Sequence, residues 1–388
     1  MISPERGAGH PGRRTVVTAT ALTINGVFPV FLVAGLAVLI RPELGFSEAQ
    51  LGMSVASFLT ATSIFSVFGG RLADGVGHAR SFLLAAVFTC TGLVLGGSAA
   101  SWGQLTVGLA LAGVGNGLTQ PAANLVLARN VNVRRMALAF GIKQAAIPTA
   151  ILVAGITLPL VAVQLGWRVP MFAAATIGLP IAILGSRLRA TGAPLRSERR
   201  RRVTGRMALL TLACALGSAS ATALGTFLVE ASVALGVSVP VAGAVLTTSS
   251  AVGILARISV GWFTDRFGGR YFSTLFWMLS AGAAGFTVLA WAQTLPLLLI
   301  GALLGFGAGW GWPGLMIYAA AKTHPEHPAT ASGIVQAGGQ AGAAIGPFAF
   351  GVLIMTTGYS TAWVAAAVTA AIAAVMVRGA AALRGDTS

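Results

Sequence analysis

Long apolar stretches, separated by short polar or basic segments, follow one another along the whole chain. A helix needs about 17 to 25 predominantly apolar residues to cross a bilayer, and runs of that length can be read from the hydrophobic pattern. Twelve such runs lie at approximately 16–40, 49–69, 81–99, 103–127, 137–163, 169–186, 207–233, 240–263, 272–292, 295–320, 332–356 and 361–377. The pattern therefore predicts an all-α membrane protein with twelve transmembrane helices.

Composition supports this prediction. Of the 388 residues, 56% are hydrophobic and only 9% are charged, whereas soluble domains carry about 25% charged residues. The 51 glycines are also typical of membrane helices, because small residues let transmembrane helices approach closely. The chain is therefore expected to lie in the lipid bilayer.

The net charge of +16 follows the predicted topology. If the loops alternate between two sides, one side carries only Arg41 and Arg168. The other carries Arg6, Arg13, Arg14, Arg71, Arg80, Arg129, Arg134, Arg135, the basic run from Arg187 to Arg206, Arg266, Arg270, Lys322, Arg378 and Arg384. Because basic loops stay on the cytoplasmic side, we expect a multi-pass protein of the inner (plasma) membrane with both termini cytoplasmic. Some basic residues are expected to contact anionic lipid, and no nucleic-acid partner is needed to explain them.

The chain repeats itself after 191 or 192 residues. "GVGNGLTQP" at 113–121 aligns with "GFGAGWGWP" at 305–313, and Asp74 aligns with Asp265. The repeat predicts two pseudo-symmetric six-helix bundles, at 1–186 and 207–388, joined by a basic cytoplasmic linker at 187–206. Parallel repeats of this kind build transporters with a site near the midplane, although a duplication with only structural meaning stays open.

The loop after the second span of each half carries a recurring motif. "GGRLADGVGHAR" at 69–80 and "GWFTDRFGGR" at 261–270 both frame an aspartate with glycines. With the twelve spans and the repeat, this motif resembles that of the major facilitator superfamily, G-x-L-x-D-R/K-x-G-R-R/K. The first copy departs from it at Gly75 and His78. The candidate gating residues are Gly70, Asp74, Gly77, Arg80, Gly261, Asp265, Arg266, Gly268 and Arg270.

A carboxylate at a helix end either accepts backbone N–H groups or pairs with nearby arginines. In the second case the motif acts as a latch that holds one conformation and breaks in another. The alternative is an ordinary polar loop with a helix cap. The resemblance implies a transporter that works by alternating access, with spans one, four, seven and ten lining the cavity.

A polar stripe occupies the fourth span. Asn116, Gln120 and Asn124 follow at intervals of four residues and share one helical face. The stripe either lines a water-filled cavity or makes interhelical hydrogen bonds. The resemblance implies that it faces the central cavity and that Asn25 of span one faces it too.

Two basic residues lie inside predicted spans. Lys143 is expected roughly 10 Å deep in span five, where it either snorkels to the cytoplasmic surface or serves the cavity. Arg257 in span eight either contributes to the cavity or pairs with Asp265 or with backbone carbonyls. The resemblance implies that spans five and eight meet across the two halves, which would give the cavity a positive potential.

Other residues complete the predicted substrate site. Gln144 and Gln336 supply hydrogen bonds, and Trp310 or Trp312 supplies an apolar wall. Residues two apart point in different directions on a helix, so only one tryptophan is expected to face the cavity fully. Glu230, toward the outer end of span seven, is the one acidic residue expected at membrane depth. It is either the proton-coupling group or a solvated interfacial residue.

The most specific hypothesis is a secondary active or facilitative transporter of a small organic anion, such as a mono- or dicarboxylate. No nucleotide-binding P-loop or G-x-S-x-G motif is present, so we do not expect an enzyme. We also expect no cofactor and no metal site, and we expect the protein to be a monomer. The alternatives are a proton-coupled exporter of drugs or other small molecules, and a membrane sensor that binds a ligand without moving it.

Overall fold

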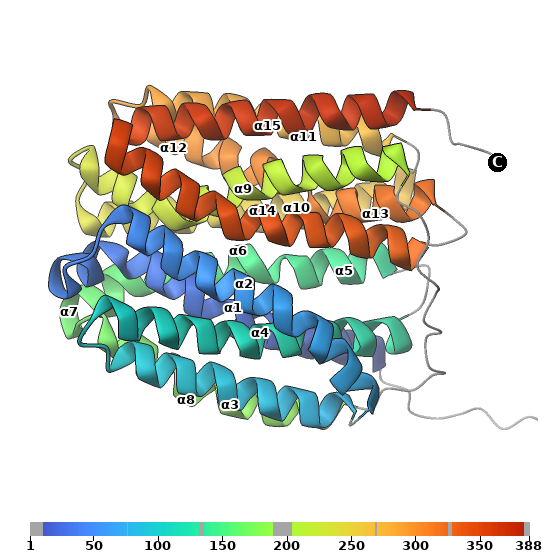
Figure 1. Cartoon of the computed structure of the whole chain (residues 1–388), viewed down its shortest axis with the longest axis horizontal. Helices are drawn as coiled ribbons and strands as arrows, with labels where there is room; N and C mark the ends of the chain where they lie inside the picture. The colour runs from blue at the N-terminus through green and yellow to red at the C-terminus, as the bar shows by residue number, and fades with distance from the viewer. Residues whose placement is uncertain are drawn as a thin grey trace, which may run out of the picture.

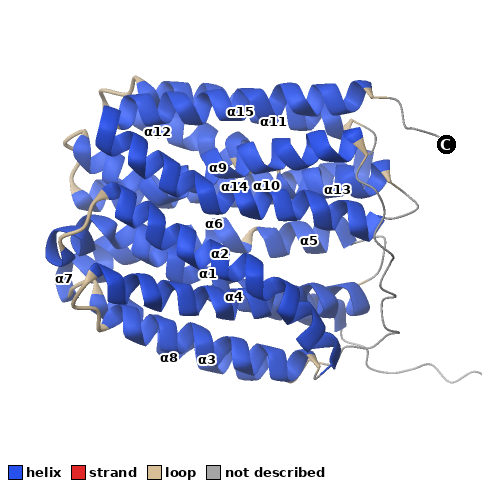
Figure 2. Ribbon diagram, viewed as in Figure 1, coloured by secondary structure: helices blue, strands red, loops and turns tan. Residues whose placement is uncertain are grey.

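The chain folds into long helices that run alongside one another (Figure 1). The computed structural model describes residues 11–75, 77–131, 136–188, 204–267, 270–324 and 328–383. Every regular element in these ranges is helical (Figure 2), which confirms the all-α prediction. The described residues up to 188, here called the N-terminal segment, gather in the lower part of Figure 1, and those from 204 on, the C-terminal segment, gather above them.

The N-terminal segment contains four uninterrupted long helices followed by a broken one. They are α1 (Pro11–Leu44), α2 (Glu48–Gly75), α3 (His78–Gly97) and α4 (Trp102–Asn130). The predicted fifth span is divided into α5 (Met136–Gln144), α6 (Ala146–Thr157), a π-helical turn η2 (Leu158–Ala162) and α7 (Val163–Leu165), and α8 (Arg168–Ser186) completes the segment.

The C-terminal segment also has one broken span. α9 (Gly205–Ala234), α10 (Val239–Phe267) and α11 (Tyr271–Ala290) are continuous, and the next span is divided into α12 (Leu295–Leu304), a π-helical turn η3 (Gly305–Gly309) and α13 (Pro313–Thr323). α14 (Pro328–Thr357) and α15 (Tyr359–Ala382) follow. The turns after α1, α3, α7, α9, α11 and α14 lie at one end of the helices. We call it the outer end, after the orientation that the charge distribution predicts.

Within the described residues, eleven helical stretches are long and apolar enough to cross a membrane. The predicted span at 103–127 forms the 29-residue helix α4, but it is not among the eleven. Its glycines, asparagines and glutamines lower its mean hydropathy, and they include the residues of the predicted polar stripe. The multi-pass membrane architecture is confirmed, and the count of twelve stays a prediction.

Glycines bring the two segments into backbone contact. A Cβ added at Gly155 of α6 would lie 2.6 Å from Thr247 Oγ1 and 3.0 Å from Gly243 O, both in α10. A Cβ added at Gly243 would in turn lie 2.9 Å from Gly155 O. Membrane helices gain stability from such close approaches through dispersion forces.

We therefore expect Gly155→Ala to destabilise the protein by about 1–3 kcal/mol, because the added methyl group must push α6 and α10 apart. Gly314→Ala is the matched control, since a Cβ at Gly314 of α13 meets no atom of the described residues within 4 Å. Thermal unfolding of the two purified variants measures the difference. Equal stability of both variants would show that this glycine contact is dispensable.

Candidate functional site

The polar stripe of α4 forms a chain of hydrogen bonds. Gln120 Nε2 donates to Asn116 Oδ1 at 3.2 Å, and Asn116 Nδ2 donates to Thr62 Oγ1 of α2 at 3.2 Å. A Cβ on Gly26 of α1 would lie 2.8 Å from Asn116 Oδ1, so α1 approaches the same face. The stripe therefore makes interhelical contacts at one end and leaves the oxygen of Gln120 for another donor.

That donor is Lys143 of α5. Its Nζ donates to Gln120 Oε1 at 2.6 Å and to Asn124 Oδ1 at 2.8 Å. Lys143 is 2% exposed, so the snorkelling alternative is wrong. Among the described residues the ion pairs are Arg41–Glu48, Arg41–Glu230 and Arg168–Glu43. The ammonium group of Lys143 is thus held by neutral amide oxygens without a described counter-charge.

Prolines create the two breaks in the spans near this lysine. Pro148 has no N–H, so the carbonyl of Gln144, four residues earlier, has no helical donor, and α5 ends at Gln144. Pro313 likewise leaves the carbonyl of Gly309 without its donor, and Trp312 Nε1 donates to that oxygen at 2.7 Å. At Trp310 the backbone has left the helix (φ −126, ψ 4), which frees its carbonyl too.

Arg257 of α10 joins the two breaks. Its Nε and Nη2 donate to Trp310 O at 3.1 and 2.9 Å, and its Nη1 donates to Gln144 O at 2.5 Å. The side chain is buried, with 4% of its surface exposed. Of the alternatives for Arg257, the backbone-carbonyl interpretation is confirmed. The Asp265 side chain lies outside the described part of the chain.

Arg257 therefore connects the C-terminal segment to the residue that follows Lys143. A Cβ on Gly141 of α5 would lie 3.7 Å from Arg257 O and 3.9 Å from the Cα of Gly261. The expected meeting of spans five and eight is thus confirmed. One network runs from α4 through α5 to α10 and the break before α13.

The two tryptophans of the broken span have different surroundings. The Trp310 ring lies 5.9 Å from the Phe31 ring of α1 and 5.6 Å from the Phe306 ring. The Arg257 guanidinium lies 5.6 Å from its centre. Trp312 is fully buried inside the C-terminal segment, where Gly217 of α9 makes room for its ring. Trp310 therefore lies with the network and between the segments, and Trp312 does not.

The remaining predicted residues are scattered. Asn25 lies against Gly178 of α8, whose Cβ would be 2.8 Å from Asn25 Oδ1. The Gln144 side chain on α5 and Gln336 on α14 are half-buried.

In the first copy of the gating motif, Gly70 lies in α2, Gly77 has a positive φ of 85°, and Arg80 is exposed. In the second copy, Gly261 and Arg266 lie in the last turns of α10, and Arg270 follows that helix. His78 Nε2 lies 2.6 Å from Leu188 O, at the start of the predicted linker. Gly268 and the side chains of Asp74 and Asp265 lie outside the described residues, as do residues 189–203 of that linker.

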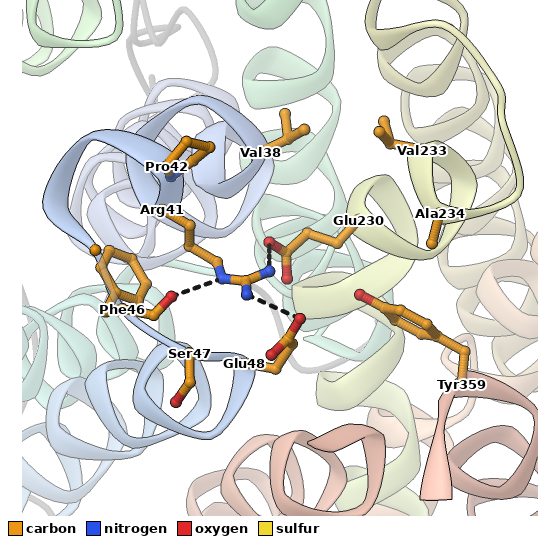
Figure 3. Close-up of a pocket in the computed structure, with 11 residues that line it drawn as sticks. Val38, Arg41, Pro42, Phe46, Ser47, Glu48, Glu230, Val233, Ala234 and Tyr359 are labelled. Atoms are coloured by element: carbon orange, nitrogen blue, oxygen red, sulfur yellow. Dashed lines mark hydrogen bonds and ion pairs between the residues drawn. The ribbon is translucent and has the colours of Figure 1, made fainter. Parts of the chain in front are cut away.

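A second charged cluster, which sequence reasoning missed, lies at the outer end (Figure 3). Arg41 Nη1 donates to Glu230 Oε1 at 2.7 Å, its Nη2 lies 2.8 Å from Glu48 Oε1, and its Nε donates to Phe46 O at 3.1 Å. Glu230 is 5% exposed, so the solvated interpretation of Glu230 is wrong. The predicted topology places Arg41 among the two basic residues of the outer side, but no residue spacing in the sequence predicts its partner Glu230, which is 189 residues away.

Comparison with known proteins identifies the type of chain. A family model described as Major Facilitator Superfamily matches residues 16–211 and again 207–384. The cephamycin export protein CmcT of Amycolatopsis lactamdurans is 30% identical over 197 residues, which cover 47% of this chain and 40% of that protein. The match thus spans less than half the length of this curated relative.

Solved structures share the fold at low identity. A mutant of the nucleoside transporter NupG matches with a TM-score of 0.75 and 13% identity, covering 94% of this chain and 99% of that one. The human organic anion transporter MFSD10 matches with a TM-score of 0.70 and 14% identity, covering 95% and 99%. Their named cargoes differ, although the helical arrangement is common to all.

Proposed function

The chain belongs to the Major Facilitator Superfamily, and on that premise we propose that it carries a small organic anion across the membrane by alternating access. It is a transporter and not an enzyme. The observation that carries the proposal is the burial of Lys143 against partners that, among the described residues, are all neutral.

A buried cation without a counter-charge is costly. On insertion scales a lysine at the centre of a transmembrane helix costs about 2.5–3.5 kcal/mol, and two amide oxygens offset only part of this. A bound carboxylate would supply the missing negative charge and form a charge-assisted hydrogen bond with Nζ. Binding of an anion would therefore offset the free energy that the burial of Lys143 costs.

The proposed binding residues combine the network with two residues retained from the sequence prediction, Gln144 and Gln336. Lys143 contacts the anion, Gln120, Asn116, Gln144 and Gln336 offer amide groups, and Trp310 provides an apolar wall. Arg257 acts through its positive field and holds the two helix breaks in place, because its described donors are occupied by carbonyls. Asn25 and Trp312 are left out of the site, since they pack elsewhere.

The architecture of the proposal retains the sequence hypotheses. We take α4 as the twelfth span, since its polar residues face other helices rather than lipid. Residues 1–186 and 207–388 form the two bundles that rock about the site, and 187–206 link them in the cytoplasm. The glycine-framed motifs act as latches at the inner end. Both termini are cytoplasmic, and the protein works as a monomer in the plasma membrane.

Export of a small molecule is the second candidate, because the named relative is an export protein. The direction of transport and the coupling ion are questions separate from the identity of the substrate. If protons drive the carrier, either the anion itself takes the proton or Glu230 does.

Proteoliposomes test the proposal. Purified protein is reconstituted and offered labelled monocarboxylates, dicarboxylates and neutral isosteres, with and without an imposed pH gradient. We expect saturable flux of at least one anion and none of its neutral isostere. Flux of neutral or cationic solutes alone would reject an anionic cargo, and binding without flux of any solute would favour the sensor.

A further inference from the structure

The outer-end cluster opens into a pocket with a volume of about 670 Å³. Val38, Arg41, Phe46 and Glu48 line it from the N-terminal segment, and Glu230, Val233 and Tyr359 line it from the C-terminal segment. Figure 3 shows the Tyr359 hydroxyl pointing toward the two carboxylates. The volume is within the range of ligand sites, about 300–1,000 Å³.

The charges in this pocket do not balance. Arg41 contributes one positive charge and Glu48 and Glu230 contribute two negative ones, so one negative charge is in excess. The second carboxylate oxygen of Glu230, Oε2, is buried and has no hydrogen-bond partner within the described part of the chain. A buried charged acceptor without a donor carries a desolvation cost, and the side chain of Glu230 is only 4% exposed.

We propose that this pocket binds an organic ammonium ion, whose N–H groups bond to Glu230 Oε2 and whose carbon chain packs against Val38, Val233 and the ring of Tyr359. The excess negative charge selects a cation. An anion is disfavoured because Arg41 already binds two carboxylates and a backbone carbonyl.

The size and walls of the pocket select an organic cation over a bare ion. A small inorganic ion or a proton at Glu230 would satisfy the carboxylate and leave most of the volume and its apolar wall unused. Ligand sites typically combine such an apolar wall with a few placed polar groups.

The occupant would touch both segments at once. Arg41 and Glu230 already connect α1 to α9 at this end, and a ligand that touches both helices adds contacts that exist only while they stay together. Since a ligand stabilises the conformation that binds it better, occupancy is expected to favour the arrangement in which α1 and α9 are joined at this end. The site is independent of the anion proposed at Lys143.

Calorimetric titration of the full-length protein with n-butylammonium chloride tests the site, against sodium chloride of equal ionic strength. The wild type is expected to show saturable binding. Glu230→Gln keeps the shape of the side chain but removes its charge, and a lost charge-assisted hydrogen bond is expected to weaken binding at least about tenfold. Glu43→Gln is the matched control, because Glu43 is an outer carboxylate paired with Arg168 outside this pocket.

Two further variants keep the test decisive. Val233→Trp fills the pocket while Glu230 retains its charge, and it is expected to abolish binding even if Glu230→Gln does not fold. Lys143→Gln is expected to bind the probe as the wild type does, which separates this site from the transport proposal. The proposal is rejected if the wild type shows no saturable binding, if Glu230→Gln binds equally well, or if neutral 1-butanol binds as tightly as the ammonium ion.

Discussion

Replacing Arg257 with methionine is expected to lower the free energy of unfolding by about 2 kcal/mol. The substitution removes the described side-chain donors of Gln144 O and Trp310 O in the protein interior, and an unsatisfied buried acceptor costs about 1–3 kcal/mol. Removing a buried charge without a described counter-ion offsets part of that loss. Arg14→Met is the control, since Arg14 is an exposed arginine of α1 outside the gating motif.

A double-mutant cycle isolates the reason for that loss. Pro148→Ala restores an N–H to position 148, which can bond to Gln144 O if α5 and α6 become continuous. Arg257→Met is therefore expected to cost about 1 kcal/mol less in the Pro148→Ala background, as measured by denaturant unfolding in micelles. An identical cost in both backgrounds would contradict the assignment of Arg257 to the proline-freed carbonyl.

Lys143→Gln is expected to reduce anion flux at least about tenfold, because a charge-assisted hydrogen bond to the substrate is lost. The same substitution removes a buried positive charge whose described hydrogen-bond partners are Gln120 and Asn124. The variant should therefore be at least as stable as the wild type, the trade-off expected where a site is strained for function. Thermal unfolding and proteoliposome flux give the two readouts.

Lys322→Gln serves as the control for Lys143, because Lys322 is exposed near the end of α13 and its loss should change neither flux nor stability. Lys143→Arg should retain part of the flux, since it keeps the charge. Loss of stability together with full flux in Lys143→Gln would instead make Lys143 a structural residue.

Much of this architecture could be predicted from the sequence, because a helix in lipid must be apolar over the length that crosses the membrane. The apolar runs determined the helices, and the spacing of Asn116, Gln120 and Asn124 determined their common face. The breaks in two spans are also local, since Pro148 and Pro313 remove helical donors. These signals depend on neighbours within a few residues.

The contacts across the molecule could not be predicted in the same way. Arg257 reaches a carbonyl 113 residues away, and Arg41 reaches a carboxylate 189 residues away. Nothing in the periodicity of either helix specifies such partners. The neighbour of Asn25 could not be predicted either, because a polar residue in an apolar span does not specify which helix it lies against, and in the structure it lies against Gly178 of α8.

Restoring a positive charge at position 143 tests the central claim most directly. Lys143→Cys is made in a chain whose Cys90 and Cys214 are replaced by serine, and labelling is verified by mass spectrometry. Aminoethyl methanethiosulfonate, which adds an ammonium group, is predicted to restore anion flux in proteoliposomes, whereas sulfonatoethyl methanethiosulfonate, which adds a negative group, is predicted not to. Equal flux with both labels would contradict a role for the charge of Lys143.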